Sequence, residues 1–600
     1  MKKQLLVLTL IVNTLFISTA FADNVPSVLE TALQAEKKST FTIKNNETIS
    51  NWQNAFGNRQ QSQKLTIKGN FNTIKSDNIN SPSLVGIIVN KPNDSNEILS
   101  KKQVLSLSNF ILESFKIALT NYGGTVNISS MIFNKNITSK NGGAVYNDSG
   151  VVNINGSSKN YASFTLNKAI SGGAVFNNGT LNMKNTVVGG RKIDYVGHID
   201  ETTGLESDVA VITSLGNIAN FGGGVYNANI ANISGVSFIY NTAEYDGGGL
   251  YNTGKLTLSS SVFEDNKAIN GGAVYTLYTG DNAKHVVNIS KSKFYNNTAT
   301  TSGGVVYVQS GKTIINKSTF GSQFGNGNSA VNGGAIYNSG ADTQIISSSF
   351  SQNYANKGGD IFNTGTMTIS KSTFGYAPKK NYFSTGVLNK WTVAGKTDYS
   401  NVRDNFEGID IVKIPIDELY GSSAKQGGAI FNQANMIINS SKFMYASAIE
   451  GGAIYNDENG TLTINKSNFV NNSAKNKSTT PDDEKVADSD LKGGAIYNKG
   501  NISIIKSTFD GNIAENGIGG GIYNAEGFVS MTGSTLKNNS AKQGGAIYNN
   551  AKMNITSSTF ILNNADEGGA IYNGSKGNLT LTKVTFGNAK KKQKYTNNAQ

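Results

Sequence analysis

The stretch from Gly544 to Glu567 reads GGAIYNNAKMNITSSTFILNNADE and holds one complete copy of a repeat that fills most of this 600-residue chain. It contains three short β-prone pieces, Ala546–Tyr548, Met553–Thr556 and Ser558–Ile561, separated by Gly, Asn or Ser. Each piece is too short for a helix or for a stable hairpin. Three such strands in about 25 residues are typical of one coil of a right-handed parallel β-helix, whose strands pair with those of the next coil about 4.8 Å away.

The first part of the repeat, Gly-Gly-small-aliphatic-aromatic-Asn, recurs along the chain, most often every 24 to 26 residues. The gap of 50 residues between two of its copies is close to two periods and predicts a degenerate copy between them. Copies begin at Gly142, Gly172, Gly222, Gly247, Gly333, Gly358, Gly427, Gly451, Gly493, Gly519, Gly544 and Gly568, and looser ones at Gly271 and Gly303.

A second motif, Phe-x-x-Asn, recurs in register with the first. Its Phe rings are expected to fill the core, where burial stabilises by roughly 2–3 kcal/mol per ring. The Phe residues are Phe133, Phe164, Phe238, Phe263, Phe294, Phe350, Phe469, Phe509 and Phe560, with Leu536 as a variant.

Comparison of the copies within this one chain predicts which side chains point inward. The fourth position is always Val, Leu or Ile, whereas the third accepts Ala, Gly, Val305 and Asp360. Because side chains alternate across a strand, the aliphatic residue should face the core, and the third position and the aromatic residue should face outward. The Asn that follows shares the inward parity, so its amides are expected to hydrogen-bond along the stack. The paired glycines allow positive φ and a tight turn.

The residues singled out as structural positions of this repeat come from several copies. They are Gly142, Gly143, Val145, Tyr146, Asn147, Phe263, Asn266, Gly544, Gly545, Ile547, Tyr548, Asn549, Phe560, Asn563, Gly568, Gly569, Ile571, Tyr572 and Asn573.

The N-terminus carries an export signal. Two lysines, an apolar run from Leu5 to Ile17 and the sequence Ala20-Phe21-Ala22 are typical of a secretory signal peptide, residues 1–22, cleaved after Ala22. The alternative is a membrane anchor, but the run is shorter than the ~20 residues that span a bilayer. The mature chain is therefore expected to be exported.

Residues 23–60 are expected to form an N-terminal cap region. Ile49, Trp52 and Phe56 mark one face of an amphipathic helix at 46–57, which would cover the strand edges of the first coil. A membrane-binding amphipathic helix is the alternative. The β-helix then occupies residues 61–588, with its first strand at Leu65–Lys68, and a basic tail follows at 589–600.

The composition excludes several kinds of protein. Cysteine is absent, so neither disulfides nor thiolate metal sites stabilise the fold. The net charge of +13 becomes 13 − 2 = +11 when Lys2 and Lys3 leave with the signal peptide, and it is nearly all lysine, with only Arg59, Arg191 and Arg403. Nucleic-acid readers rely on arginine, so we expect a solvated, mildly basic surface and no nucleic-acid partner.

Three departures interrupt the repeat, at about 186–216, 375–424 and 474–491. Excursions from repeat scaffolds tend to carry recognition. The middle one supplies the candidate ligand-binding residues Tyr382, Phe383 and Trp391. The alternative for each departure is a neutral loop that a stiff solenoid tolerates.

The pairing of GGA-[Ile/Val/Leu] with Phe-x-x-Asn over roughly residues 130–588 resembles the repeat of polymorphic outer membrane proteins. The resemblance implies an autotransporter surface protein whose β-helical passenger acts as an adhesin. Members of that family end in a transmembrane β-barrel with an aromatic last residue, whereas here repeats run to Phe586 and Gln600 is last. We therefore expect a passenger-like protein that is either released into the medium or retained at the outer-membrane surface by an anchoring partner, with truncation of the gene as the alternative.

Parallel β-helices of the pectin lyase-like fold also include polysaccharide lyases and glycosidases. Hydrolysis needs two carboxylates about 5–9.5 Å apart, yet most repeat positions carry Asn, Ser or Thr. His198 lies near several acids (Asp194, Asp200, Glu201) and could form a metal site, with a solvated loop as the alternative; His285 has no matching acid. No nucleophile elbow, phosphate loop or zinc spacing occurs. We therefore expect no catalysis, no metal and no cofactor.

The sequence thus favours an adhesin-like binding scaffold that acts as a monomer and binds a host or neighbouring cell-surface protein or glycan. One alternative is a polysaccharide-active enzyme that uses Asp404, Glu407 and Asp410 of the middle insertion. The other is a structural envelope protein without a dedicated ligand.

Overall fold

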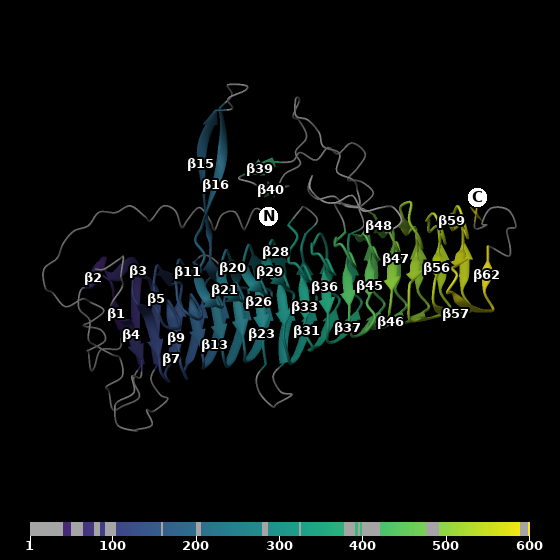
Figure 1. The fold of residues 1–600 in the computed structure, drawn as a ribbon. Coiled ribbons are helices and arrows are strands. Elements are labelled where there is room, and N and C mark those ends of the chain that lie inside the picture. The colour runs from purple at the N-terminus through teal and green to yellow at the C-terminus, as the bar shows by residue number, and fades with distance from the viewer. Residues whose placement is uncertain are drawn as a thin grey trace. The chain divides into compact units, whose positions relative to one another are not determined.

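The structure is a computed structural model. It describes residues 40–49, 64–76, 85–89, 104–157, 160–199, 206–278, 286–322, 326–376, 391–393, 396–398, 421–475, 491–587 and 598–599. The chain divides into two compact units, the first reaching residue 244 and including 248–254, the second holding 245–247 and the residues from 255 onward. In each unit, short strands stack coil upon coil (Figure 1). The described ranges contain no helix that could cross a membrane, nor any other helix.

The copy at 544–567 shows how one coil is built. It forms β56 (Ile547–Asn549), β57 (Lys552–Thr556), β58 (Thr559–Ile561) and β59 (Asn564–Ala565). The first three pair in parallel and in register with the next coil, so that Ile547 lies beside Ile571 and Phe560 beside Phe586. The predicted parallel β-helix is confirmed, and the short fourth strand was not predicted. Below, the four are called the first, second, third and fourth strands of a coil.

In the first unit, β3 and β5 each run through the positions of a second and a third strand. The other second and third strands follow in pairs. The strands are β1 (Thr40–Thr42), β2 (Glu47–Ile49), β3 (Lys64–Ser76), β5 (Val104–Glu113), β7 (Thr125–Ser129), β8 (Ile132–Asn134), β10 (Val151–Asn155), β11 (Ala162–Thr165), β13 (Thr180–Lys184), β14 (Thr186–Gly189), β19 (Ile230–Ser234) and β20 (Ser237–Ile239).

The first strands of this unit form a second sheet. They are β4 (Val85–Val89), β6 (Ile117–Asn121), β9 (Val145–Asn147), β12 (Val175–Asn177), β18 (Val225–Asn227) and β22 (Leu250–Asn252). The remaining strands of this part of the chain are the hairpin β15 (Arg191–Ile199) and β16 (Glu206–Ser214), the fourth strand β17 (Ile218–Phe221), and β21 (Thr242–Asp246), which spans the division between the units.

In the second unit, second and third strands again alternate along the chain. They are β23 (Lys255–Ser259), β24 (Val262–Glu264), β27 (Val286–Ser290), β28 (Lys293–Tyr295), β31 (Lys312–Asn316), β32 (Thr319–Phe320), β34 (Asp342–Ile346), β35 (Ser349–Phe350), β37 (Thr366–Ser370), β38 (Thr373–Phe374), β42 (Asn435–Asn439), β43 (Lys442–Met444), β46 (Thr461–Asn465), β47 (Asn468–Val470), β50 (Asn501–Ile505), β51 (Thr508–Asp510), β54 (Phe528–Thr532), β55 (Thr535–Lys537), β57, β58, β61 (Asn578–Thr582) and β62 (Thr585–Phe586).

The first strands of the second unit are β26 (Val274–Thr276), β30 (Val306–Val308), β33 (Ile336–Asn338), β36 (Ile361–Asn363), β41 (Ile430–Asn432), β45 (Ile454–Asn456), β49 (Ile496–Asn498), β53 (Ile522–Asn524), β56 and β60 (Ile571–Asn573). Its fourth strands are β25 (Lys267–Asn270), β29 (Thr298–Ser302), β44 (Ser447–Ala448), β48 (Ser473–Ala474), β52 (Ile513–Ala514), β59 and β63 (Asn598–Ala599), and β39 (Trp391–Val393) and β40 (Lys396–Asp398) form a small hairpin.

The N-terminal cap differs from the prediction. Glu47–Ile49 is strand β2, which pairs in parallel with β3, so the helix predicted at 46–57 is wrong at its start. Strand β1 also precedes the expected first strand at Leu65. An extended edge strand continues the hydrogen-bond lattice of the coils. The rest of the predicted helix and the predicted signal peptide lie outside the described residues.

The alternation predicted for the first strand fails at its third position. Ala546 is fully buried, as is the aliphatic Ile547 beside it, and Val305 and Asp360 at the equivalent place are buried too. The reason is that the strand begins only at Ile547. The N–H groups of Ala546 and Ile547 both donate to the same carbonyl, that of Ala570 in the next coil, so the backbone bends between them and strand parity does not apply.

The two glycines of each pair are required for two different reasons. Gly544 has φ +65, the left-handed region in which glycine alone is unstrained. The φ of Gly545 is not in that region, but a Cβ on it would lie 2.4 Å from the carbonyl oxygen of Gly569 in the next coil. The first glycine therefore makes the turn, and the second lets adjacent coils approach.

The 50-residue gap holds no degenerate copy, contrary to the prediction. Strand β12 pairs directly with β18, so that Val175 lies beside Val225 in the next coil. The additional residues form the antiparallel hairpin β15–β16, with Arg191 opposite Ser214 (Figure 1). In the same way β36 pairs directly with β41, so that Ile361 lies beside Ile430.

Candidate binding surface

The Asn that ends each first strand forms a buried amide ladder. Asn498, fully buried, donates from Nδ2 to Oδ1 of Asn524 at 2.9 Å and accepts from Nδ2 of Asn456 at 2.9 Å. Its amide also donates to the Gly500 carbonyl, which fixes the following turn. Equivalent ladders run through Asn121, Asn147, Asn177, Asn227 and Asn252 in the first unit and through Asn338, Asn363, Asn432, Asn456, Asn498, Asn524, Asn549 and Asn573 in the second.

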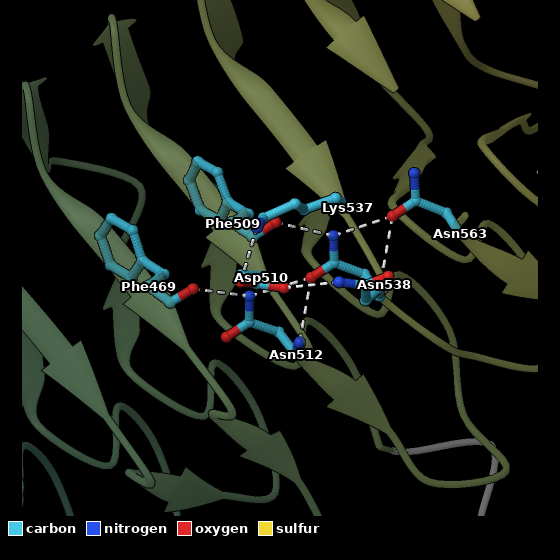
Figure 2. A network of polar contacts seen from close by, with 8 residues as sticks. Phe469, Phe509, Asp510, Asn512, Lys537, Asn538 and Asn563 are labelled. Atoms are coloured by element: carbon cyan, nitrogen blue, oxygen red, sulfur yellow. Dashed lines mark hydrogen bonds and ion pairs between the residues drawn. The ribbon is translucent and has the colours of Figure 1, made fainter. Parts of the chain in front are cut away.

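The Asn of Phe-x-x-Asn forms a second ladder at another corner (Figure 2). Asn512 donates to Oδ1 of Asn539 at 2.9 Å and to the carbonyl of Phe469 at 3.1 Å, and it accepts from both N–H and Nδ2 of Asn472. Asn538, just before Asn539, is exposed, and its side-chain amide donates to Asp510. The buried amides thus replace backbone pairing where the chain turns.

Asp360 lies where this second ladder is interrupted. The next coil carries Ser422 at the ladder position, and Asn353 donates to Oδ1 of Asp360 at 2.8 Å instead. Ser422 also donates to Oδ1, whereas Oδ2 is buried and has no partner within the described residues. Burial raises the pKa of the Asp360 carboxyl to about 7, although the hydrogen bonds from Ser422 and Asn353 act to lower it. The carboxyl is therefore largely neutral below pH 7.

Asp360 makes the stability of this protein depend on pH. The folded carboxyl keeps its proton up to about pH 7, while the unfolded one loses it near pH 3.9. The stabilisation by the bound proton is therefore fully present below about pH 4 and is lost as the pH rises to about 7, a loss of about 4 kcal/mol at most. The denaturant midpoint of unfolding should decrease from pH 4.5 to pH 8, and it should decrease less for Asp360→Asn than for the unchanged chain. Equal decreases would contradict the assignment.

A serine ladder, which the sequence analysis missed, holds the corner between second and third strands. Ser467 donates from Oγ to the carbonyl of Asn465, and its Oγ accepts the N–H of Ser441 in the preceding coil at 3.2 Å. The residue before it, Lys466, has φ +50. The recurring x-Ser-x-Phe in the sequence is its signal, and in the second unit it comprises Ser261, Ser292, Ser318, Ser348, Ser372, Ser441, Ser467, Ser507, Ser534 and Ser558.

The aromatic residues of the first strands stack in a file. The ring centroids of Phe431 and Tyr455, and those of Tyr455 and Tyr497, are 4.8 Å apart with nearly parallel planes. The rings occupy the outward position of the first strand: in many coils the ring is partly exposed between a buried aliphatic residue and a buried Asn, and in the coils of Phe431, Tyr455 and Tyr497 each ring face is covered by its neighbour. Burial first, then Glu450, raises the pKa of Tyr455 and Tyr497 well above the usual range. The file stabilises the stack and offers no free aromatic face between coils.

The candidate ligand-binding residues are only partly described. Trp391 begins β39, where it lies opposite Asp398, and Tyr382 and Phe383 lie outside the described residues, as do Asp404, Glu407 and Asp410. The structure therefore does not place these candidate residues together.

The possible metal site around His198 is placed through its backbone. His198 lies in β15 opposite Ser207, and Asp194 is in the same strand. Among the described side chains no group of three or more acids and histidines could hold a metal ion. His285, Asp200 and Glu201 lie outside the described residues.

The hairpin β15–β16 is the described element that departs most from the coils. It forms a two-stranded sheet of its own. At its base the N–H of Leu215 donates to the carbonyl of Gly190 at 2.8 Å, so the chain leaves and re-enters its coil at one point. Val211 and Ile212 on β16 are 44% and 46% exposed. The hairpin thus presents apolar side chains to solvent.

Comparison with known families identifies the repeat. The model of the Chlamydia polymorphic membrane protein repeat matches residues 130–148, 291–309 and 533–550. The chain therefore carries polymorphic membrane protein repeats in these three segments. Each match begins at a corner residue with positive φ (Ser130, Lys291 or Gly533) and runs through a third strand and the glycine pair to the end of a first strand. The polymorphic membrane protein repeat therefore joins both motifs in one structural segment. No curated protein matches the chain.

Proposed function

We propose that this chain is an exported, adhesin-like binding scaffold of the cell surface, without catalytic chemistry of its own. The polymorphic membrane protein repeat supports an outer-membrane or surface location. The buried polar side chains support a structural use of the coils, because the Asn and Ser ladders consume them in hydrogen bonds between coils. Binding is then left to the elements that depart from the coils.

The observation that carries the proposal is the exposed apolar surface of the hairpin β15–β16. An isolated two-stranded hairpin is marginally stable in water, and exposed apolar residues mark interaction sites when they occur together. Val211 and Ile212 lie next to each other on β16 and are both exposed. Because consecutive strand residues point to opposite faces, the hairpin carries one of these apolar side chains on each face, and a partner that encloses the hairpin from both sides would bury both side chains and order it. The hairpin is therefore the proposed contact with a protein on a host or neighbouring cell.

Removal of the hairpin should strongly reduce attachment without unfolding the coil. Residues 191–214 are replaced by Gly-Gly, which the adjacency of Gly190 and Leu215 permits. The purified mature chain, immobilised on beads, is scored for retention of cells that the unchanged chain retains. We expect retention to decrease by about tenfold or more, as for the loss of a central apolar contact, with an unchanged thermal unfolding midpoint.

Point variants separate the apolar contact from the loop itself. Val211→Ser with Ile212→Ser should reduce retention nearly as far as the deletion. The matched control is Ile170→Ser with Ile218→Ser, which changes two exposed residues of the same unit outside the hairpin. Full retention by the deletion variant would refute the hairpin contact. If the same preparation released reducing sugars from a panel of acidic and neutral glycans, the protein would be an enzyme and not only a binding scaffold.

A further inference from the structure

The second unit carries a file of lysines at one corner of its coils. The residue just before each ladder serine has positive φ and is exposed. The β-pairing places these corner residues one above another: the N–H of Lys466, for example, bonds to the carbonyl of Ile505, next to the corner of the following coil. Five of these positions are lysine, and Lys583, which precedes Val584, is the sixth lysine at this corner; we call the six the lysine file: Lys291, Lys317, Lys371, Lys466, Lys506 and Lys583.

The backbone does not require lysine at this corner. Positive φ favours Gly or Asn over a long side chain. Other coils use Ser347, Ser440, Gly533 or Ser557 at the same place and with the same sign of φ. Packing does not explain why these positions are lysine, because the six side chains are exposed. Ion pairing does not explain it either, because none of the six forms a salt bridge with an acid in the described ranges. Lysine at this corner therefore acts on something outside the coil.

The positions next to the file carry no acidic residue. The residue directly before each corner position and the second residue after it are Ser, Thr, Asn, Ile, Val or Lys in every coil from Ser259 to Thr585. Lys293 and Lys442 add to the file from the adjacent position. The serine ladder fixes the corners at one spacing of about 4.8 Å per coil. From Lys291 to Lys506 the file extends six coils, or about 30 Å.

We propose that the lysine file binds a linear sulfated polysaccharide along the coil axis. A row of single positive charges that are one to three coils apart along one line suits a partner with many anionic groups in a line, because each contact adds to the others. Lysine binds such groups as a point charge and needs no bidentate geometry. The flanking Ser, Thr and Asn side chains can hydrogen-bond sugar hydroxyls between the sulfates. This surface is separate from the hairpin of the proposed function.

Two other polyanions fit less well. Single-stranded nucleic acids stack their bases on open aromatic faces, whereas the first-strand aromatic rings stack on one another. Arginine, the usual reader of bases, occurs in the described ranges only as Arg191, which is in the first unit. A membrane surface is bound by apolar side chains beside the basic ones. On the outward side of the second strands that the structure describes in this unit, Ile437 is the only large apolar residue that is exposed rather than half-buried.

The test compares two variants with the same change in net charge. The file variant replaces Lys317, Lys371, Lys466 and Lys506 by Ser, the residue that other coils carry at this corner. The control variant replaces Lys267, Lys425, Lys542 and Lys576, exposed lysines elsewhere in the second unit, by Ser. Binding of heparin to the full mature chain is measured by titration at several salt concentrations. We expect the file variant to bind about tenfold or more weakly, with a smaller salt dependence, and the control to bind nearly as the unchanged chain does.

Each other outcome overturns the proposal. Equal weakening in both variants would mean that only net charge matters. Binding of single-stranded DNA, or of vesicles with anionic lipids, that is as tight as heparin binding and equally dependent on the file would assign the file to that partner. Undetectable heparin binding by the unchanged chain would refute it outright. Heat-unfolding midpoints of the two variants, expected to agree, show that the comparison is between folded chains.

Discussion

Replacing Ala546 by Asp is expected to lower the free energy of unfolding of the second unit by about 3–5 kcal/mol, as for an unpaired buried charge. Ala546 is fully buried although it occupies the position at which the repeat accepts Asp360. Asp360 is tolerated because Asn353 and Ser422 donate to it at the interruption of the ladder. Around Ala546 the ladder continues: Asn539 already donates to Asn563, so a carboxylate there finds no free donor.

Denaturant unfolding of three variants checks this expectation. Ile522→Asp, a charge at a fully buried aliphatic position, should be about as destabilising as Ala546→Asp. Asn554→Asp, on the outward side of β57, should shift the midpoint little. If Ala546→Asp behaved like Asn554→Asp, the third position of the motif would face solvent after all and the inward assignment would be wrong.

Replacing Asn512 by Leu is expected to destabilise the second unit by about 3–6 kcal/mol, since each buried group left without its partner costs about 1–3 kcal/mol. The substitution removes the acceptor for the N–H and Nδ2 of Asn472 and the donor to the carbonyl of Phe469. It also leaves Oδ1 of Asn539 without its side-chain donor. Leu is of similar size, so the effect reports on hydrogen bonds rather than on a cavity.

The matched control is Asn538, the exposed corner residue just before Asn539 in the next coil. Asn538 has φ +57 and is joined to Asp510 by an exposed hydrogen bond. Asn538→Gly keeps the backbone unstrained and should change the unfolding free energy by less than about 1 kcal/mol. Equal effects from the two substitutions would mean that the buried amide ladder does not stabilise the coils.

The coil itself could be predicted from the sequence because its period is nearly constant. The three strands found in 544–567 lie within one or two residues of those expected, and the Phe side chains such as Phe263 and Phe294 are fully buried. Repetition compensates for short strands, since each copy gives the same evidence again. The inward direction of Ala546 could not be predicted, because a bend, and not strand parity, decides it.

The less regular features depend on pairing between coils, which a single copy does not reveal. The edge strand at Glu47–Ile49 is defined by its partner β3, although its local pattern favoured a helix. The hairpin at 191–214 looked like two periods of the repeat until the direct pairing of Val175 with Val225 was known.

The surfaces proposed for binding could be predicted only in part. A departure at 186–216 could be recognised from the interrupted spacing, but not its form as a hairpin with Val211 and Ile212 exposed. The lysine file is scattered along the sequence at one residue per coil and looked like a solvated surface. The pairing register stacks Ser290 on Asn316 and Asn465 on Ile505, the residues that directly precede corner lysines. Only this register shows that the lysines lie in a line.

The central claim, display of the scaffold at the cell surface, is tested most directly by adding protease to intact cells of the source organism. Cleavage products are followed with an antibody against the mature chain, and an internal protein serves as the control for cell integrity. The account predicts that the chain is found in the envelope fraction and is cut while the internal protein stays whole. A chain that is cut only after the cells are lysed would contradict surface display.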